Sequence, residues 1–589
     1  MTAPNRATLW GRVLVDELAA GGLEAVCLAP GSRSTPLTVA FAAHPDVEVY
    51  SHLDERSAAF FALGRGRRTG EPTALVCTSG TAAANFHPAV IEASQARVPL
   101  LVLTADRPPE LRDSGANQTI DQLDLYGDAV RWEGQLPEPE ADERKVRSVR
   151  TTAARALAKT TQTPAGPVHL NCPFRKPLEP VEVPSDVPED FGETLAGGGR
   201  DGPFVETSGG RTRPDQPDVE LVANALEDAA RPLLVAGPAD PPGLDADALA
   251  ELATAVDAPI LADPLSGVRF GSHVVDVPVF GGYDAYLEAV PDPDVVVRTG
   301  ASPTSKSLRQ YLRDADARQF LVDPAGEWRE ATFTATDLLA VDPELLLAAV
   351  CETLADCDAT SATEDGWLER FRVAEDRHWA VTDEACEPGA VADAPFEGAI
   401  LAAVLEGAPD PATVFVSNSM PVRDADRFGR PREAALTVLA NRGASGIDGI
   451  TSTALGAGSA TTEPLVCVLG DLAFYHDMNG LLALSRCGVD ATIVLLDNDG
   501  GGIFHQLPIE AFDPPFTEQF KTPHGLAFDP VAELYDLEFE RISPSAFADA
   551  YRASLSAPGT QVLAVEFDAE ASHRRREELQ RRVRDALET

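Results

Sequence analysis

Short apolar runs alternate with segments of helical periodicity along most of the chain. The pattern is clearest between Pro464 and Gln506, where apolar runs at 465–469 and 492–496 flank a segment whose apolar residues have helical spacing. Such runs on either side of a helix predict a βαβ crossover, whose parallel strands end at the same edge of a sheet. Ligands of open parallel sheets bind at that edge, so the residues after these two strands are the first candidates for a functional site.

Oxygen-bearing side chains follow both strands of this crossover. The first strand ends at Asp471, and the second runs into Asn498 and Gly500. Mg²⁺ prefers oxygen ligands and usually completes its shell with phosphate and water, so we expect a metal site made of the Asp471 carboxylate, the Asn498 amide oxygen and the Gly500 carbonyl. The glycines at 500–502 would let the backbone approach a diphosphate closely. Taken singly, Gly-Asp is more often only a helix cap and Asn-Asp-Gly only a turn, so the prediction depends on their pairing across one crossover.

The first third of the chain repeats this alternation and predicts a doubly wound domain. The expected elements are a helix at 7–20, strands at 23–28 and 47–50, a helix at 57–66, and strands at 73–77 and 100–103. The loop 30–36 follows a strand and carries serine and arginine side chains that could bind an anion. Glu55 lies at a predicted helix start, where a carboxylate commonly does no more than compensate the helix dipole.

Two further regions of alternating strands and helices follow. A chain of 589 residues is too long for one hydrophobic core, so several domains are expected. The middle region has expected strands at 232–236, 259–262 and 294–298. Stretches rich in proline, glycine and acids at 176–217, and in Asp, Thr and Ala at 355–394, predict linkers on either side of it. The sequence therefore predicts an α/β protein with three doubly wound parallel-sheet domains, at 1–180, 215–355 and 390–589.

Three other patterns could suggest further functions, but the residues within each pattern argue against them. The segment after 294–298 is close to a P-loop, but Ser305 stands in place of its second glycine, which argues against ATP. The glycines of 443–449 lack the G-x-G start of a dinucleotide fingerprint, which argues against NAD. The arginine-rich stretch at 573–584 predicts an amphipathic surface helix and nothing more.

The composition of the chain argues against several functions and cellular locations. A net charge of −45 repels nucleic acid and anionic membranes, and the small number of lysines is typical of a protein kept soluble in concentrated salt. No apolar run reaches the roughly 20 residues that span a bilayer, and the first residues lack the signal-peptide pattern. The eight cysteines have no metal-binding or CxxC spacing, so we expect reduced core residues in a cytoplasmic protein.

Several stretches together resemble one enzyme family. The matching stretches are PGSRSTPLT (30–38), DERSAAFFALG (54–64), TSGTAAAN (78–85), LTADRPPELRDSGANQTI (103–120), GPVHLNCPF (166–174), SNSMPVRDAD (417–426), NRGASGIDG (441–449) and NDGGGIFHQLP (498–508). They are similar to the 2-succinyl-5-enolpyruvyl-6-hydroxy-3-cyclohexene-1-carboxylate synthases, the thiamine enzymes of menaquinone biosynthesis. The Asp471–Asn498 pair resembles the thiamine diphosphate motif, with Leu472 in place of its third residue and Asp497 in place of its first asparagine.

The resemblance implies the pyruvate decarboxylase-like architecture, with thiamine diphosphate and Mg²⁺ (or Mn²⁺) as cofactors. It implies decarboxylation of 2-oxoglutarate and 1,4-addition of the resulting succinyl unit to isochorismate. It also implies a homodimer or homotetramer whose active sites lie between chains, so that Glu55 and Asp471 of one site come from different chains. Both substrates are dianions, and arginine suits them because its planar fork binds carboxylates bidentately.

The resemblance also assigns roles by matched position. Glu55 would support the imino tautomer of the cofactor in an apolar pocket that raises its pKa, and Ile447 would prop the cofactor into its bent form. Cofactor contacts would come from Gly470, Gly500 and Gly501. Arg423 and Ser419 would hold the distal carboxylate of the oxoglutarate unit. The remaining expected site residues are Arg442, Asn117 and Gln118 at the reacting centre, Ser32, Arg33, Arg107 and Lys306 for isochorismate, and Ile503, Phe504 and Leu507 as the apolar wall.

Two alternatives stay open at this stage. The same cofactor machinery would serve another thiamine diphosphate-dependent 2-oxo-acid decarboxylase or carboligase. A non-catalytic cofactor-binding protein could share the fold, although Glu55 argues against it because pure binding has little use for a proton-relay carboxyl group. Ser307 stands where some relatives carry a basic residue after the lysine, which bears on the isochorismate contacts of the middle domain.

Overall fold

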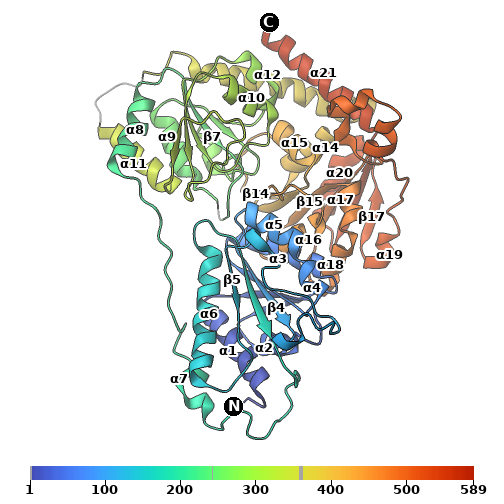
Figure 1. Cartoon of the computed structure of the whole chain (residues 1–589). Coiled ribbons are helices and arrows are strands. Elements are labelled where there is room, and N and C mark those ends of the chain that lie inside the picture. The colour runs from blue at the N-terminus through green and yellow to red at the C-terminus, as the bar shows by residue number, and fades with distance from the viewer. Residues whose placement is uncertain (1–2, 242, 357–361, 589) are drawn as a thin grey trace. The chain divides into compact units, whose positions relative to one another are not determined.

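The computed structural model describes residues 3–241, 243–356 and 362–588, which form two compact units. The first unit is built from the chain up to Gly210 together with Asn441–Thr462 and Asp477–Val489, and the second from the remainder. Three six-stranded parallel sheets run through the described residues, one in the first unit and two in the second (Figure 1). The predicted α/β class is therefore confirmed, while the domain bounds 1–180, 215–355 and 390–589 stay predictions.

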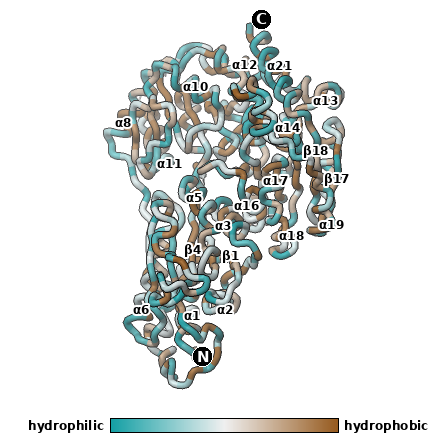
Figure 2. Tube along the Cα trace, turned by 45° about the vertical axis from the view of Figure 1, so that its right-hand side comes forward, coloured by the Kyte–Doolittle hydropathy of each residue, from teal (hydrophilic) through white to brown (hydrophobic). Residues whose placement is uncertain are grey.

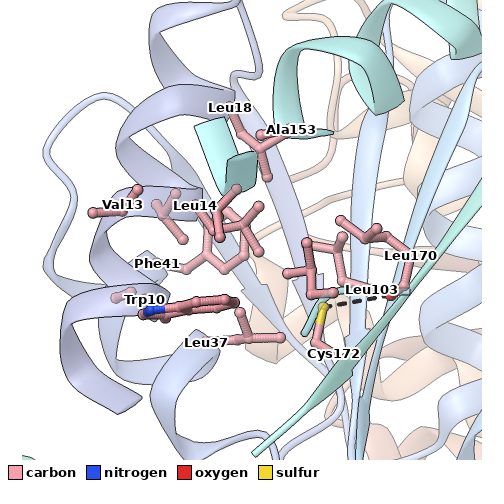
Figure 3. Close-up of a cluster of buried hydrophobic side chains, with 14 of the residues drawn as sticks. Trp10, Val13, Leu14, Leu18, Leu37, Phe41, Leu103, Ala153, Leu170 and Cys172 are labelled. Carbon is pink, nitrogen blue, oxygen red and sulfur yellow. Dashed lines mark hydrogen bonds between the residues drawn. The ribbon is translucent and has the colours of Figure 1, made fainter. Parts of the chain in front are cut away.

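The first sheet has the strand order β2-β1-β3-β4-β6-β5. Its strands are β1 (Ala25–Leu28), β2 (Glu48–Ser51), β3 (Thr73–Cys77), β4 (Leu100–Asp106), β5 (Trp132–Gln135) and β6 (Pro167–Pro173). The helices of this unit are α1 (Arg6–Ala20), α2 (Thr35–Ala43), α3 (Glu55–Thr69), α4 (Thr81–Ala84), α5 (His87–Gln95), α6 (Glu143–Thr161), α7 (Leu195–Gly198), α16 (Ile450–Gly458) and α18 (Leu482–Cys487). Side chains of α1, α2 and α6 cover one face of the sheet, where Trp10, Phe41 and Leu103 belong to one buried cluster (Figure 3).

The central sheet, in the second unit, has the order β12-β11-β10-β7-β8-β9. Its strands are β7 (Pro232–Ala236), β8 (Ile260–Ala262), β9 (Val279–Phe280), β10 (Val295–Thr299), β11 (Arg318–Val322) and β12 (Asp337–Leu339). Its helices are α8 (Gln216–Glu227), α9 (Ala246–Ala255), α10 (Lys306–Asp314), α11 (Pro343–Asp356), α12 (Trp367–Cys386) and α13 (Pro388–Asp393).

The third sheet has the order β14-β13-β15-β16-β18-β17. Its strands are β13 (Ala412–Val416), β14 (Leu436–Leu439), β15 (Leu465–Gly470), β16 (Thr492–Asp497), β17 (Glu538–Arg541) and β18 (Gln561–Glu566). Its helices are α14 (Glu397–Gly407), α15 (Met420–Phe428), α17 (Asp471–His476), α19 (Val531–Tyr535), α20 (Phe547–Ser554) and α21 (Ala569–Glu588).

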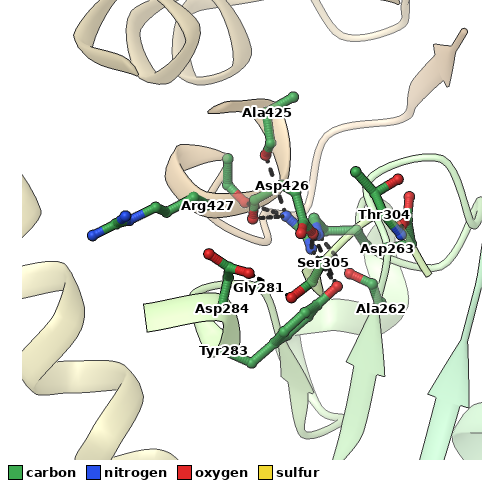
Figure 4. A network of polar contacts seen from close by, with 12 residues as sticks. Ala262, Asp263, Gly281, Tyr283, Asp284, Thr304, Ser305, Ala425, Asp426 and Arg427 are labelled. Atoms are coloured by element: carbon green, nitrogen blue, oxygen red, sulfur yellow. Dashed lines mark hydrogen bonds and ion pairs between the residues drawn. The ribbon is translucent and has the colours of Figure 1, made fainter. Parts of the chain in front are cut away.

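A buried arginine ties the central and third sheets together inside the second unit. The Arg269 guanidinium is fully buried and lies 2.7 Å from the Asp426 carboxylate near the end of α15. The Tyr283 hydroxyl donates to the same carboxylate at 2.9 Å (Figure 4). Arg269 also donates to the carbonyl of Ala262 at the end of β8, so the network fixes α15 against the central sheet.

Both predicted linkers are wrong in part, and each has a packing reason. Part of the expected linker 176–217 is core of the first unit, because Val187, Phe191 and Ala196 are buried in the same cluster as Trp10. The expected linker 355–394 contains the 20-residue helix α12, whose Trp367 is fully buried and donates to the carbonyl of Pro232 at 2.8 Å.

The crossover between β15 and β16 is also not one helix. α17 begins at Asp471, a 3-10 turn follows at Met478–Leu481, and α18 completes the connection.

Among the described residues, all the cysteines are free and either buried or partly buried, and Cys357 lies outside them. The described chain contains no helix that combines the length and the hydropathy needed to cross a membrane.

Candidate active site

The predicted pair Asp471 and Asn498 lies at one edge of the third sheet. β15 and β16 are parallel neighbours, with Gly470 opposite Leu496, so their carboxyl ends meet. The Asp471 side chain is 2% exposed, and its Oδ2 accepts the backbone N–H groups of Asn498 at 3.2 Å and Gly500 at 2.9 Å. The carboxylate therefore organises the turn after β16 as well as offering an oxygen to a cation.

The side-chain amide of Asn498 has its two ends in different surroundings. Its Nδ2 donates to the Glu397 carboxylate at 2.8 Å, whereas its Oδ1 is buried and has no hydrogen-bond partner among the described residues. A buried amide oxygen without a donor is costly unless something else satisfies it. Together with Asp471 it forms the kind of oxygen donor set that Mg²⁺ or Mn²⁺ takes, so the residues present fit a divalent cation.

The glycine turn after β16 approaches its neighbours closely. Gly500 has φ +131°, and a Cβ at this position would lie 2.0 Å from the carbonyl oxygen of Lys521. Gly501 is buried and follows directly, and both lie at the sheet edge that carries Asp471. The backbone here can lie against the segment at Phe520 and Lys521 only because these positions have no side chain.

The predicted apolar wall follows the same turn. Ile503 and Phe504 lie in a 3-10 helix at Gly502–Gln506 and are partly buried, and the Phe504 ring packs edge-on against Phe520 with centroids 5.4 Å apart. Leu507 comes next and is 47% exposed. The sequence therefore places an apolar surface directly beside the glycine turn.

Ser419 and Arg423 lie at the carboxyl end of β13, which pairs with β15. Ser419 has φ +74°, an uncommon value for a residue other than glycine, and α15 begins directly after it. Arg423 follows one turn later and donates to the carbonyl of Ser419. This half-buried guanidinium belongs to the same sheet edge as Asp471. Lys306 does not, since it is exposed at the start of α10 on the central sheet.

The first unit gathers a second set of predicted residues at the carboxyl edge of its own sheet. Arg33 follows β1, is 5% exposed, and donates to the carbonyl of Phe174 after β6 at 2.6 Å. Burial lowers the pKa of Arg33, the charge of Arg107 after β4 lowers it further, and the charge of Asp106 opposes both. Two guanidinium groups and one carboxylate therefore lie near one another at this edge of the sheet. Ser32, Asn117 and Gln118 are exposed on loops of the same edge.

Glu55 is the first residue of α3 and is half-buried. The N-cap of this helix is Asp54, whose carboxylate accepts the backbone N–H of Arg56 at 2.9 Å. The positive N-terminus of the helix therefore already has a carboxylate other than Glu55. Burial raises the pKa of the Cys77 thiol, and the Glu55 charge adds to that rise, which places Glu55 near the end of β3. The capping role is therefore taken, and Glu55 remains available for other chemistry.

The loop that carries Arg442 and Ile447 also belongs to the first unit. The Glu92 carboxylate on α5 is 3% exposed and accepts three successive backbone N–H groups of the loop, from Gly443 at 2.7 Å, Ala444 at 2.6 Å and Ser445 at 3.3 Å. A cavity of about 190 Å³ lies beside the loop, lined in part by Phe60 and Glu92.

Comparison with known proteins decides the family. Residues 10–125 match the N-terminal and residues 424–565 the C-terminal thiamine pyrophosphate (TPP) binding domain of thiamine pyrophosphate enzymes. The chain is 63% identical to the 2-succinyl-5-enolpyruvyl-6-hydroxy-3-cyclohexene-1-carboxylate synthase of Haloarcula marismortui, over 100% of both chains. The synthases of Halobacterium salinarum and Roseiflexus castenholzii are 61% and 48% identical, covering 99% and 98% of each chain.

The chain belongs to this synthase family. The predicted resemblance is confirmed, and the synthases are thiamine diphosphate-dependent enzymes. A thiamine diphosphate-dependent 4-hydroxybenzoylformate decarboxylase of Rhodococcus jostii has the same fold, with a TM-score of 0.69 and 17% identity over 95% of this chain and 99% of the other. The three-domain thiamine-enzyme architecture is confirmed as well.

Two residues close to Asp471 are not among the metal ligands that the sequence predicts. Asp471, Asp497 and His524 offer ligand atoms that all lie within 4.8 Å of one another. His524 comes from the loop after Lys521, and Asp499 holds that loop by accepting the backbone N–H groups of His524 at 2.9 Å and Gly525 at 2.7 Å. A single histidine 53 positions from Asp471 has no spacing signal, so no sequence pattern could have found it.

Proposed function

We propose that the chain catalyses decarboxylation of 2-oxoglutarate and 1,4-addition of the succinyl unit to isochorismate, which gives 2-succinyl-5-enolpyruvyl-6-hydroxy-3-cyclohexene-1-carboxylate for menaquinone biosynthesis. The observation that carries the proposal is full-length identity of up to 63% to synthases of that name. When bound, thiamine diphosphate supplies the electron sink for loss of carbon dioxide. The chain's own residues would bind and orient both substrates and move the protons.

Asp471, Asn498 and the Gly500 carbonyl would hold Mg²⁺ or Mn²⁺, which neutralises the diphosphate. The orphaned amide oxygen of Asn498 and the buried Asp471 carboxylate support this assignment. Gly470, Gly500 and Gly501 would border the diphosphate, and Ile447 would support the bent form of the cofactor. A hard dication at the edge of a parallel sheet, next to a glycine turn, is the usual setting for a bound diphosphate.

Arg423 with Ser419 would bind the distal carboxylate of 2-oxoglutarate, because a guanidinium fork matches a carboxylate. Arg33, Arg107, Ser32 and Lys306 would bind isochorismate. The mutual approach of Arg33 and Arg107 supports this, since two adjacent guanidinium groups suit a dianion. The other proposed site residues are Glu55 as the proton relay, Arg442, Asn117 and Gln118 at the reacting centre, and Ile503, Phe504 and Leu507 beside the thiazolium.

We further propose that the protein works in the cytoplasm as a homodimer or homotetramer with active sites between chains. The net charge of −45 supports a salt-adapted surface with few contacts to nucleic acid or anionic membranes. Sedimentation of the protein in molar potassium chloride, with and without cofactor, would test the assembly. A strictly monomeric species with full turnover would contradict it.

The deciding experiment mixes the protein with Mg²⁺, thiamine diphosphate, 2-oxoglutarate and isochorismate, and follows the loss of isochorismate absorbance. The expected outcome is a loss that requires all four components, with release of one carbon dioxide per isochorismate consumed. Carbon dioxide release from other 2-oxo acids without isochorismate consumption would favour a different decarboxylase or carboligase. Bound cofactor with no turnover of any 2-oxo acid would favour a non-catalytic protein.

A further inference from the structure

The C-terminal helix α21 was expected to be a surface helix only, and that prediction is wrong at one residue. The helix is largely hydrophilic along its length (Figure 2), yet Arg576 is 6% exposed. Its guanidinium donates to the Glu397 carboxylate at 2.5 Å and, through Nε, to the Asp424 carboxylate at 2.8 Å. One residue of the last helix therefore joins the first residue of α14 to the middle of α15.

Glu397 is the centre of this cluster. It is 2% exposed, its Oε2 accepts from Arg576 and from the Ser572 hydroxyl at 2.9 Å, and its Oε1 accepts from the Asn498 amide at 2.8 Å. Arg576, Ser572 and Asn498 all point donors at this carboxyl group, and the Arg576 guanidinium is always charged. The carboxyl group is therefore paired as a carboxylate and accepts hydrogen bonds from all three side chains.

This fact fixes the orientation of Asn498. A side-chain amide has a donor end and an acceptor end that are nearly the same size, so only its partners decide which way it faces. An ionised carboxylate accepts only the NH₂ end. The oxygen of Asn498 must then face the opposite direction, which is where it is buried without a hydrogen-bond partner among the described residues.

We propose that Glu397 is a positioning residue for the divalent cation, holding Asn498 with its oxygen toward the metal, and that Arg576 of the C-terminal helix keeps Glu397 in place for this task. The inference rests on the proposed role of Asn498 as a metal ligand. It makes α21 part of the support of the cofactor site. Partners of this kind typically change metal affinity by about 10- to 100-fold when they are removed.

Glu397→Gln is the sharpest test. The glutamine carbonyl would turn to Arg576, which can only donate, and its NH₂ would then face Asn498 and turn that amide around. We expect Mn²⁺ affinity in the presence of thiamine diphosphate, measured by electron paramagnetic resonance of free Mn²⁺, to fall about 10- to 100-fold. Glu397→Asp keeps the charge and should recover part of the affinity. An unchanged affinity in Glu397→Gln would overturn the proposal.

Asp424→Asn is the matched control, because it removes the other carboxylate held by Arg576 without touching Asn498. We expect it to lower the midpoint of thermal unfolding while Mn²⁺ affinity stays within about twofold, since its role is structural. Equal losses of Mn²⁺ affinity in Asp424→Asn and Glu397→Gln would mean that the cluster only stabilises the fold, and would overturn the proposal.

A double-mutant cycle isolates the path through Asn498. In an Asn498→Ala background, where the amide is gone, Glu397→Gln should cost no further Mn²⁺ affinity. Additive losses would show that Glu397 acts by another route and would also overturn the proposal. These measurements use no substrate. A parent protein that binds Mn²⁺ but consumes no isochorismate would therefore sink the proposed function and leave the proposal about Glu397 standing.

Discussion

The Nε2 atom of His524 lies 3.2 Å from the Oδ2 atom of Asp471. The other ring nitrogen, Nδ1, accepts the backbone N–H of Leu526 at 2.9 Å, so the proton of the neutral ring is on Nε2 and is donated to the carboxylate. Burial raises the pKa of the neighbouring Asp497 to about 6, and the Asp471 charge contributes to the rise. In this tautomer both ring nitrogens are engaged, so His524 would orient the Asp471 carboxylate for a cation and would not itself be a ligand.

An imidazole ligand would favour Mn²⁺ over Mg²⁺, whereas an imidazole that only donates to Asp471 affects the binding of both metals. We therefore expect His524→Ala to lower the affinity for both metals by about tenfold and to leave the ratio of Mn²⁺ to Mg²⁺ affinity unchanged. Isothermal titration with each metal in the presence of thiamine diphosphate measures the ratio. His476→Ala, at the exposed end of α17, serves as the control. A fall in the ratio of Mn²⁺ to Mg²⁺ affinity in His524→Ala alone would show that His524 binds the metal directly and would contradict the positioning role.

The second prediction concerns Arg423 at the start of α15. Removing one partner of a buried carboxylate–guanidinium pair typically costs about 2–5 kcal/mol, so Arg423→Ala should lower kcat/KM for 2-oxoglutarate by about two to three orders of magnitude. Use of 2-oxo acids with a single carboxylate should change little. Arg430→Ala is a matched control, because this arginine is 48% exposed and pairs with Asp383 at the surface. An unchanged preference between the two classes of 2-oxo acid would contradict the assignment of Arg423.

The sequence predicts a residue's place in the fold well where that place follows from the strand that precedes it. Asp471, Asn498 and Arg423 come directly after, or one turn beyond, apolar strands, and the parallel arrangement brings those strand ends to one edge. The local pattern is sufficient in such cases. Apolar runs mark the strands, and parallel strands joined by crossovers all end at the same edge of the sheet.

Contacts between distant segments of the chain have no such local pattern. Glu397 and Arg576 are 179 residues apart, and each alone resembles an ordinary surface charge on a helix. The stretch 355–394 predicts a linker because it is rich in Asp, Thr and Ala. Trp367 and Phe371 within it are nevertheless fully buried, and burial depends on what a helix packs against, which composition does not encode.

The third prediction concerns Glu55. Glu55→Gln keeps the size of the side chain and removes its ability to exchange a proton, so turnover of 2-oxoglutarate should fall by about 10²- to 10⁴-fold. Cofactor binding, measured by circular dichroism titration with thiamine diphosphate, should change far less. Asp54→Asn is the control, since it alters the neighbouring helix cap and leaves Glu55 in place. Full turnover in a Glu55→Gln protein that binds the cofactor would contradict the proton-relay role.

The fourth prediction concerns the close contact between α3 and α16. A Cβ at Gly64 would lie 2.0 Å from the carbonyl oxygen of Thr453, so Gly64→Ala must push the two helices apart. Overpacking of this kind costs about 1–3 kcal/mol, and the midpoint of thermal unfolding should fall by several degrees. Gly209→Ala, where a Cβ would meet nothing within 4 Å, should leave the midpoint unchanged. A Gly64→Ala protein as stable as the parent would show that the helices can separate freely.

The last prediction is a pH dependence from Asp477, which is fully buried in the first unit. The backbone N–H and the hydroxyl of Ser452 donate to its carboxylate at 2.6 and 3.1 Å, and Arg56 lies 3.8 Å away. Burial raises the pKa of Asp477 to about 6, although the contacts from Ser452 and the Arg56 charge oppose the rise.

A folded-state pKa above the ordinary value means that the protonated form favours folding. Its contribution to the free energy of unfolding is complete below the ordinary pKa of 3.8 and is lost as the pH rises through about 6. Asp477→Asn cannot lose that contribution. Between pH 4.5 and 7 its midpoint of thermal unfolding should therefore rise relative to that of the parent. The corresponding change in the difference between the two free energies of unfolding is about 1–3 kcal/mol. Parallel midpoint curves for the two proteins over this range would show that Asp477 titrates as it does in the unfolded chain.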